Sequence, residues 1–236
     1  MDLASEAGLE IRPARAEDVP ALLAIKEALR MPASGGRGGG FLLGASAEGY
    51  RLLVERAIVR VLARRGAVVG FAIALPDPLL RGSELWRRQA QIAWAPGFDP
   101  AAIAGEPIAY FDQIAVLPAA RAEAAALALR LLAELVVGGH RHVLTTTVVR
   151  PVENPAALPF LARVGARRVG ALEEVYPEVG AITSAIHVVD ADEFLARLGA
   201  AAAAPTPGLR RALALGLPAA LASGIRDLDE ARRPRR

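Results

Sequence analysis

Cysteine is absent from the sequence, and lysine occurs once, at Lys26. Without cysteine the chain can form no disulfide, offers no thiol nucleophile and supplies no thiolate to a metal, which is compatible with a reducing cytoplasm. No segment approaches the ~18 apolar residues of a membrane helix, and the start, MDLASEAGLE, lacks the basic and apolar regions of a secretion signal. We therefore expect a cytoplasmic protein with no membrane partner.

A concentrated basic surface is missing as well. The net charge is only +3, and the arginines are scattered except in ARRPRR at the C-terminal end. Nucleic-acid-binding domains gather lysine and arginine on one face or along one helix. We therefore expect no nucleic acid partner and interpret the arginine-rich end as a solvated tail, with transient nucleic-acid contact as the alternative.

What the sequence does contain is a regular alternation of apolar strands and amphipathic helices, in a chain that is 53% hydrophobic. The pattern predicts strands at residues 9–12, 58–63, 67–75, 108–117, 142–149, 167–173 and 181–189, and helices at 16–30, 46–57, 118–137, 154–165 and 190–198. Two strands followed by strand–helix units indicate a single α/β domain over residues 1–199, with a mixed sheet and helices on both faces. Residues 200–236, rich in Ala, Pro and Arg, are predicted to be a C-terminal extension that is helical or partly disordered.

The most informative segment is YFDQIAVLPAARAEAAALALR, residues 110–130. It predicts a buried strand that stops at Pro118, followed by a long helix whose first turn consists almost wholly of small residues. The first N–H groups of a helix have no partner within the helix, and the helix dipole adds partial positive charge there. Because small side chains let a phosphate reach these groups, the junction predicts an anion site with Arg121 at its mouth. An ordinary strand–helix crossover is the alternative.

A second segment, NPAALPFLARVGA at residues 154–166, predicts a short capped helix. Asn154 suits the N-cap, and Pro155 suits the first helical position, where a missing N–H costs nothing. Gly165 can end the helix in a left-handed conformation. Pro159 lies inside the helix and is expected to bend its first turn.

Together the two segments resemble the signature motifs of the GNAT acetyltransferase superfamily. The first motif is an apolar strand ending Val-x-Pro, then (Gln/Arg)-x-x-Gly-x-(Gly/Ala) and a helix; the matching positions are Val116, Pro118, Arg121, Ala124 and Ala126. The second motif is Asn-x-x-Ala-x-x-(Leu/Phe)-Tyr-x-(Lys/Arg)-x-Gly-Phe; the matching positions are Asn154, Ala157, Phe160, Arg163 and Gly165. The resemblance extends from about Leu9 to Val189.

The resemblance implies a GNAT-like α/β fold, with a mixed but mostly antiparallel sheet, helices on both faces and a central strand pair that splays apart. It implies acetyl-CoA as co-substrate and calls for no metal. Free backbone groups of the first splayed strand, from Ile114 to Leu117, would hold the pantetheine and polarise the thioester carbonyl. The residues assigned to acetyl-CoA are Ile114, Ala115, Val116, Arg121, Ala122, Glu123, Ala124, Ala125, Ala126, Asn154, Ala157 and Phe160.

The implied reaction is direct attack of an amine on the thioester, which needs a general base. Asp112 is the leading candidate, because it interrupts an apolar strand and, by period-two alternation, should share a face with Ile114 and Val116. Other candidates for groups facing the acceptor stand near the end of a later strand: Glu173, Glu174 and Tyr176. A structural role is the alternative for each of these residues.

Four positions depart from the family pattern, one of them Ala166, where the family has an aromatic residue. Leu161 stands where the family has the Tyr that is proposed to protonate the CoA thiolate, so that Tyr110 and Tyr176 remain as donors by elimination. Ala122 and Ala124 replace glycine, and a Cβ costs about 0.5–1 kcal/mol, or more where the backbone is strained. These departures leave open that the chain is a degenerate member of the family.

Two other features have weaker interpretations. The glycine-rich stretch at 31–40 lacks the Gly-Lys-Ser/Thr ending of a phosphate loop and is interpreted as a loop on the substrate side. Residues 77–107 contain both tryptophans, Trp86 and Trp94, and are interpreted as an insertion that covers the acceptor site. The alternative is that the tryptophans simply anchor a surface excursion to the core. The three histidines, His140, His142 and His187, do not have the spacing of a metal set.

The sequence thus predicts an N-acetyltransferase that transfers an acetyl group from acetyl-CoA to an amine of a small molecule or protein, as a monomer or homodimer. One alternative is a GNAT-fold module that binds CoA or a partner without catalysis. A protein-interaction role of the Ala/Arg-rich C-terminal part is the third.

Overall fold

The computed structural model describes residues 8–30, 45–176 and 180–232, and the glycine-rich stretch at 31–40 lies outside them. Within these ranges the strands form an eight-stranded sheet in which only the central neighbours β5 and β6 are parallel. In spatial order the strands are β1 (Leu9–Pro13), β2 (Ile58–Arg64), β3 (Ala67–Leu75), β5 (Ile108–Val116), β6 (His142–Arg150), β8 (Gly180–Asp190), β7 (Arg167–Tyr176) and β4 (Ala93–Trp94). The predicted mixed, mostly antiparallel sheet is confirmed.

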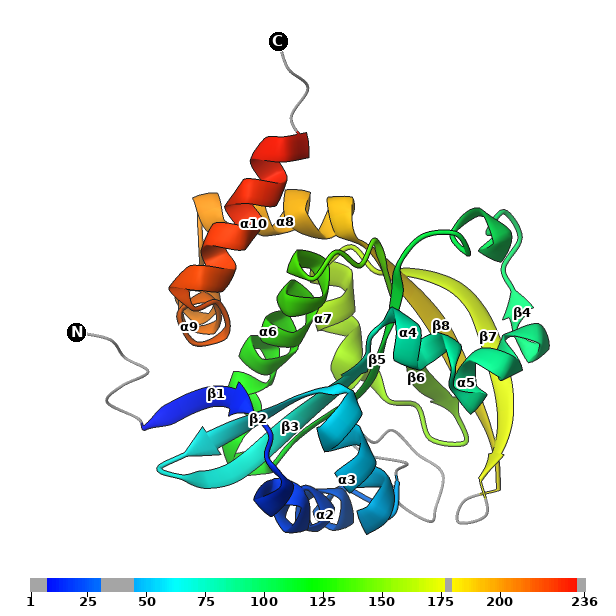
Figure 1. Cartoon of the computed structure of the whole chain (residues 1–236), viewed down its shortest axis with the longest axis horizontal. Helices are drawn as coiled ribbons and strands as arrows, with labels where there is room; N and C mark the ends of the chain where they lie inside the picture. The colour runs from blue at the N-terminus through cyan, green and yellow to red at the C-terminus, as the bar shows by residue number, and fades with distance from the viewer. Residues whose placement is uncertain (1–7, 31–44, 177–179, 233–236) are drawn as a thin grey trace.

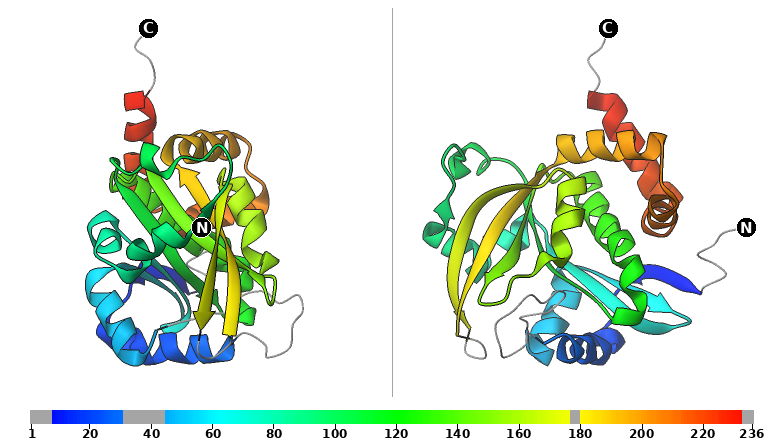
Figure 2. Two further views of the ribbon diagram at one scale, coloured as in Figure 1. Left: turned by 90° about the vertical axis from the view of Figure 1, so that its right-hand side faces the viewer. Right: turned by 180° about the vertical axis from the view of Figure 1, so that it is seen from behind.

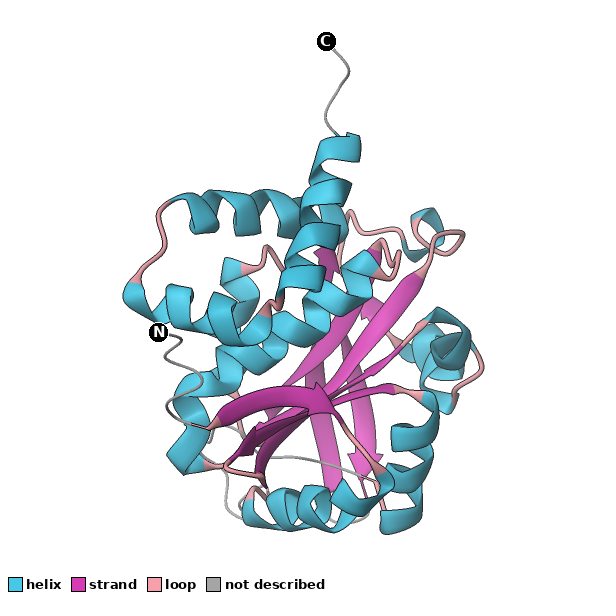
Figure 3. Cartoon of the chain, turned by 60° about the vertical axis from the view of Figure 1, so that its left-hand side comes forward, coloured by secondary structure: helices cyan, strands magenta, loops and turns pink. Residues whose placement is uncertain are grey.

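Helices cover both faces of this sheet (Figures 1 and 3). Helices α2 and α3 pack on one face, and α6 to α10 lie on the other. The helices are α2 (Val19–Ala28), α3 (Ala47–Arg56), α4 (Asp77–Arg81), α5 (Glu84–Arg87), α6 (Ala124–Val137), α7 (Leu158–Arg163), α8 (Ala191–Ala203), α9 (Pro207–Gly216) and α10 (Ala219–Arg232). Short 3-10 segments are η1 (Ala16–Asp18), η2 (Arg88–Gln91), η3 (Pro100–Ala102), η4 (Pro118–Glu123) and η5 (Pro155–Ala157).

The C-terminal helices are part of the main core (Figure 2). Helix α6, AAALALRLLAELVV, is apolar on nearly all sides, and such a helix must be covered all round. The sheet covers one side, while α9 and α10 cover the other and bury Leu215 and Leu221 in the same cluster as Leu131. Helix α8 continues to Ala203, beyond the predicted end at residue 198, because the alanine run has high helix propensity. Of the two forms predicted for residues 200–236, the described part is helical.

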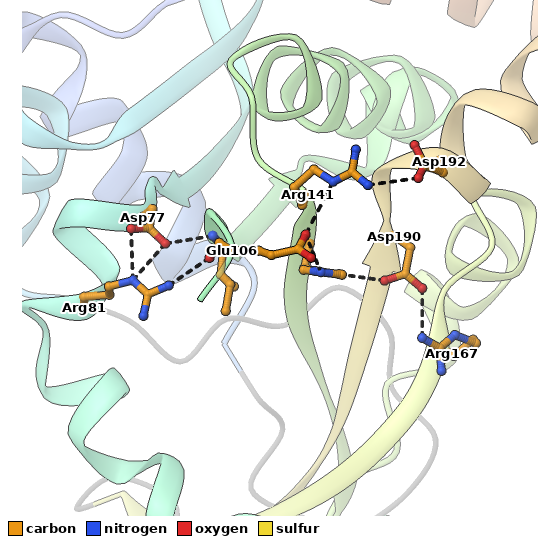
Figure 4. Close-up of polar contacts among 9 residues, drawn as sticks. Asp77, Arg81, Glu106, Arg141, Arg167, Asp190 and Asp192 are labelled. Atoms are coloured by element: carbon orange, nitrogen blue, oxygen red, sulfur yellow. Dashed lines mark hydrogen bonds and ion pairs between the residues drawn. The ribbon is translucent and has the colours of Figure 1, made fainter. Parts of the chain in front are cut away.

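The parallel pair is fastened at its start by an ionic network (Figure 4). His142, the first residue of β6, lies with Nδ1 2.7 Å from Asp190 Oδ1 and Nε2 3.3 Å from Glu106 Oε2. Burial alone would raise the pKa of Asp190, but hydrogen bonds from Arg167 and His142 lower it. The first residues of β5 and β6 are therefore held together, and the strands can diverge only farther along.

Candidate active site

Strands β5 and β6 separate about halfway along their length. They pair only over Ile108–Phe111 and His142–Thr145; beyond these residues β5 stays with β3, and β6 stays with β8. At the point of separation the Thr145 hydroxyl donates a hydrogen bond of 2.8 Å to the Phe111 carbonyl oxygen. The predicted splayed central pair is confirmed.

Asp112 is an extra residue of β5 at this point. The register between β3 and β5 skips one residue here and leaves Asp112 without a partner in β3, which is a β-bulge. Because a bulge interrupts the alternation of side chains, Asp112 lies beside Gln113, whose amide donates to Asp112 Oδ2 at 3.1 Å. Gln113 in turn accepts a hydrogen bond of 2.9 Å from Tyr50 of α3, whereas Ile114 and Val116 pack on the opposite face. The prediction that Asp112 shares a face with Ile114 and Val116 is wrong because of the bulge.

The splay leaves one backbone edge of β5 without a strand partner among the described residues. Leu117 N–H donates to the Val69 carbonyl at 2.9 Å, and hydrogen-bonded positions alternate along an antiparallel pair, so Ala115 also bonds to β3. Ile114 and Val116 then direct their N–H and C=O groups into the gap between β5 and β6. The backbone groups predicted to hold the acyl donor therefore reduce to those of Ile114 and Val116, and Ala115 lies outside the gap.

The α-helix after β5 begins later than predicted. Pro118 is the first residue of η4, and α6 begins only at Ala124. The N–H of Ala120 donates to the Leu117 carbonyl at 2.8 Å, and that of Ala124 donates to the Arg121 carbonyl. These two N–H groups already donate to carbonyl groups of the chain, so a phosphate at this junction would have to share them.

Glu123 points away from the gap and ties the junction to the C-terminal helices. Its side chain is 4% exposed, with Oε1 2.5 Å from Arg211 Nη2 of α9 and Oε2 3.6 Å from Arg64 Nη2 of β2. Ala126 is buried against α9, and Ala122 is exposed to solvent. These three predicted acetyl-CoA residues could therefore act only through their backbone.

The second motif forms the far wall of the gap. The Asn154 side chain accepts a hydrogen bond of 3.3 Å from Ala156 N–H, and Gly165 ends α7 with a φ of 81°, both as predicted. Pro159 does not bend a continuous helix, contrary to the prediction. The segment divides into η5 and α7, and Pro159 stands in the first turn of α7, where no N–H partner is needed.

A cavity of about 830 Å³ runs through the gap and joins the two faces of the sheet. The predicted acetyl-CoA residues that line it are Ile114, Val116, Arg121, Ala124, Ala125, Asn154, Ala157 and Phe160. The predicted catalytic residues that line it are Tyr110, Asp112, Glu174 and Tyr176. The cavity thus connects the strand–helix junction with a group of carboxylates and phenols.

No protein-family model matches the sequence, and no curated protein sequence does. Solved structures do match. An N-acetyltransferase from Staphylococcus aureus Mu50 aligns with a TM-score of 0.51 at 21% identity, over 78% of this chain and 98% of that chain. The ribosomal-protein-S18-alanine N-acetyltransferase of Escherichia coli aligns with a TM-score of 0.51 at 17% identity, over 77% and 93%. Arabidopsis thaliana NAA60, solved in complex with acetyl-CoA, aligns with a TM-score of 0.53 at 17% identity, over 77% and 99%.

The chain has the GNAT fold. On the α3 side of the gap in this GNAT fold, the carboxylates of Asp112 and Glu174 have different surroundings. Burial raises the pKa of Asp112 to about 6; the Gln113 hydrogen bond opposes the increase and the Glu174 charge adds to it. Burial also raises the pKa of Glu174, but Arg88, with Nη1 2.8 Å from Glu174 Oε1, limits that increase. Asp112 has no ion-pair partner among the described residues, so it is the carboxylate available to exchange a proton.

Two phenols complete this side of the GNAT-fold gap. Tyr110 Oη lies 2.9 Å from Thr146 Oγ1, just past the last paired residues of β5 and β6. Burial raises the pKa of both Tyr110 and Tyr176, so both hydroxyls keep a proton to donate. Glu173 is exposed on the other face of β7 and does not line the cavity.

Two polar residues of the site, Tyr50 and Arg88, are not among those predicted from the sequence. Tyr50 of α3 donates to Gln113, and Gln113 donates to Asp112, so these two side chains orient the carboxylate. The sequence pattern indicates a core residue at Tyr50, because it falls on the apolar face of its helix. Only its hydroxyl group indicates a second role. Arg88 carries no signal, because it belongs to the insertion and reaches Glu174 only through the fold.

None of the three histidines lines the cavity, and each has a partner. His140 Nε2 accepts a hydrogen bond of 3.2 Å from Asp77 N–H, and His187 lies 3.0 Å from Thr147 Oγ1. His142 belongs to the ionic network described above. Over the described ranges, no group of three or more His, Cys, Asp or Glu side chains could hold a metal ion, and no helix is long and apolar enough to cross a membrane.

Proposed function

We propose that the protein is an acetyl-CoA-dependent N-acetyltransferase that acts on an amine. The observation that carries the proposal is the continuous cavity, in which the open backbone edge at Ile114 and Val116 meets the Asp112 carboxylate. The names of similar structures give further support: two are N-acetyltransferases, and NAA60 was solved with acetyl-CoA.

The side of the cavity next to α6 fits an acyl-CoA. Ala124 and Ala125 keep the helix start narrow, and Arg121 supplies a positive charge beside it, as a diphosphate requires. Ile114, Val116 and Phe160 provide an apolar wall for a pantetheine chain. When bound there, acetyl-CoA supplies the activated acetyl group.

The opposite side of the cavity fits the amine. Asp112 accepts a proton from the incoming ammonium, directly or through one water, and the neutral nitrogen attacks the thioester carbon. The N–H groups of Ile114 and Val116 point into the gap and stabilise the negative charge that develops on the carbonyl oxygen. A C–N bond forms and the C–S bond breaks. The thiolate takes up one proton, and the attacking nitrogen gives up a second proton, which restores the donor.

Tyr110 is expected to supply that proton. Its hydroxyl and that of Thr146 stand at the vertex of the splay, and Leu161 cannot donate one. Tyr110→Phe should therefore lower turnover by about 10²-fold, the lower end of the range for loss of a general acid. Thiol release measured with Tyr176→Phe as the comparison checks this. Equal and unchanged rates in both variants would make water the donor.

Bulk at the helix start is expected to weaken acetyl-CoA binding. Ala124 lines the cavity at the junction, so Ala124→Leu should raise the dissociation constant about 10-fold or more by occupying the diphosphate's place. Ala196→Leu, at an exposed position of α8, is the matched control. Calorimetry on folded variants measures both, and equal affinities would place the diphosphate elsewhere.

Turnover separates the proposed enzyme from a GNAT-fold module that only binds CoA. Purified protein is incubated with acetyl-CoA and a panel of small amines and peptides, and free thiol and acetylated product are measured together. Amine-dependent release of thiol in equal amount to product supports the enzyme. Saturable acetyl-CoA binding without release for any amine supports the binding module.

A further inference from the structure

We propose that the acceptor is a small primary amine with an apolar body, bound in a pocket beneath the 77–107 insertion; this inference rests on the proposed acetyl transfer. The insertion forms a roof over the acceptor side of the cavity. Trp86, Trp94 and Ile103 of the roof line the cavity together with Leu172 and Ile186 of the sheet below.

The roof is fastened at several points and is therefore preformed. Arg81 lies over the Trp86 ring at 5.0 Å from its centroid and donates to the Glu106 carbonyl at 2.9 Å. The Asp77 carboxylate accepts a hydrogen bond of 2.7 Å from the Ile108 N–H at the start of β5. These contacts tie the first turn of the insertion to its last residues and hold Trp86 in place.

The middle of the roof is a strand of the sheet. β4 pairs with β7 through Ala93 and Trp94, and Ala95 N–H donates to the Val169 carbonyl at 2.8 Å. Gly170 of β7 permits this approach, because a Cβ there would lie 3.0 Å from the Ala93 carbonyl oxygen and 3.3 Å from the Trp94 ring. β4 therefore covers the edge of β7 at this position. We call the part of the cavity between the roof and the sheet the chamber.

Polar groups concentrate at one end of the chamber. Asp112 and Glu174 stand at the gap, and Arg88 already pairs with Glu174, so among the residues that the structure describes one of these two carboxylates remains to meet one ammonium. The walls beneath the tryptophans are hydrocarbon, contributed by Ile108, Leu172 and Ile186 among others. An acceptor with one ammonium group and an apolar body matches this distribution of polar and apolar groups.

Two other acceptor classes match it poorly. A polyamine would leave its second ammonium against the apolar wall, and burial of an unpaired charge is costly. A polypeptide N-terminus brings an amide N–H and C=O at every residue, and each would need a partner that the hydrocarbon wall lacks. The chamber therefore selects against both classes and in favour of alkyl or arylalkyl amines.

Two measurements test the proposal. The first is kcat/KM for transfer to butylamine, pentylamine, hexylamine, spermidine and an Ala-Gly-Ala peptide amide. Each added methylene should raise kcat/KM about fourfold, the ratio expected for burial of one CH2, and hexylamine should exceed spermidine and the peptide about 10²-fold. Higher values for spermidine or the peptide, while transfer occurs, would overturn the acceptor class and leave the proposed function intact.

The second measurement is independent of turnover. The chain's two tryptophans both line the chamber, so intrinsic fluorescence reports its occupation. Hexylamine should shift the emission saturably in the presence of CoA, and spermidine and the peptide should not. A saturable shift without thiol release would support amine binding in the chamber and contradict the proposed acetyl transfer. No shift with hexylamine would contradict the proposed chamber.

A variant of the roof and a control variant on an exposed surface test whether the chamber binds the amine during turnover. Ile103→Ala should raise KM for hexylamine about 10-fold with little change in kcat or in acetyl-CoA affinity, because it removes wall and leaves the gap intact. Leu52→Ala, on the exposed side of α3, is the control. Should Ile103→Ala fail to fold, Ile103→Val gives the same direction with a smaller change; an unchanged KM in the folded variant would contradict the proposal.

Discussion

Asparagine in place of Asp112 is expected to lower amine-dependent turnover by about 10²–10⁴-fold, with acetyl-CoA affinity nearly unchanged. The amide keeps the shape of the side chain and removes its capacity to accept the ammonium proton. In the wild type, turnover should decline as the pH falls through about 6, the pKa to which burial raises this carboxyl, because the protonated acid cannot act as a base. The variant should lack this decline.

The stability of the same variant should change in the opposite sense to its activity. The folded-state pKa of Asp112 lies above its ordinary value of 3.8, so the folded protein binds this proton more tightly than the unfolded chain. Asp112 therefore destabilises the fold progressively as the pH rises from about 4 through about 6. At pH 7, Asp112→Asn should be more resistant to urea than the wild type.

Glu173→Gln is the matched control for both measurements, because Glu173 is an exposed carboxylate that does not line the cavity. It should leave turnover and the pH profile unchanged. Wild-type turnover in Asp112→Asn, together with a loss of stability, would make Asp112 a structural residue.

Removal of α9 and α10 is expected to leave a protein that is insoluble or about 5 kcal/mol less stable. A chain that ends after Ala204 loses Leu215 and Leu221, each 9% exposed, and a buried leucine contributes about 1.5–3 kcal/mol. It also exposes the outer side of α6. Urea denaturation measures the loss, and a chain that ends after Arg232 is the control. A chain ending after Ala204 that is as stable as the full chain would make the extension a separate appendage.

Two glycines of α9 give a sharper version of this test. A Cβ on Gly216 would lie 2.6 Å from the Ala126 carbonyl oxygen, whereas a Cβ on Gly208 would meet no atom within 4 Å. Gly216→Ala should therefore destabilise the protein by about 1–3 kcal/mol. Gly208→Ala should leave it unchanged or about 0.5–1 kcal/mol more stable, because alanine favours the helix.

Seven strands and the two sides of the gap could be predicted from the sequence because their signals are local, whereas β4 has only two residues and gives no such signal. The second motif has strong helix-start and helix-stop residues, Asn154, Pro155 and Gly165, which mark both of its ends. Val116 and Pro118 likewise mark where β5 stops. The strands themselves follow from short apolar runs between turns.

Other features depend on contacts that no local pattern reports. The bulge at Asp112 follows from the register of β3 against β5, so strict alternation assigned the residue to the wrong face. The pairing of Glu123 with Arg211 joins residues 88 positions apart, so the local pattern alone predicts Glu123 as part of the anion site. The apolar character of α6 on all its sides indicates that another layer covers it, but no local pattern shows that residues of the alanine-rich extension supply this layer.

A crystal structure with CoA bound tests the proposed function most directly. We expect the diphosphate beside Arg121 and Ala124 and the pantetheine along the open edge of β5 at Ile114 and Val116. The sulfur should lie at the vertex near Tyr110 and Thr146, with Asp112 on the acceptor side of it. CoA bound outside the gap, or an empty gap at millimolar CoA, would contradict the assignment of this cavity to acetyl transfer.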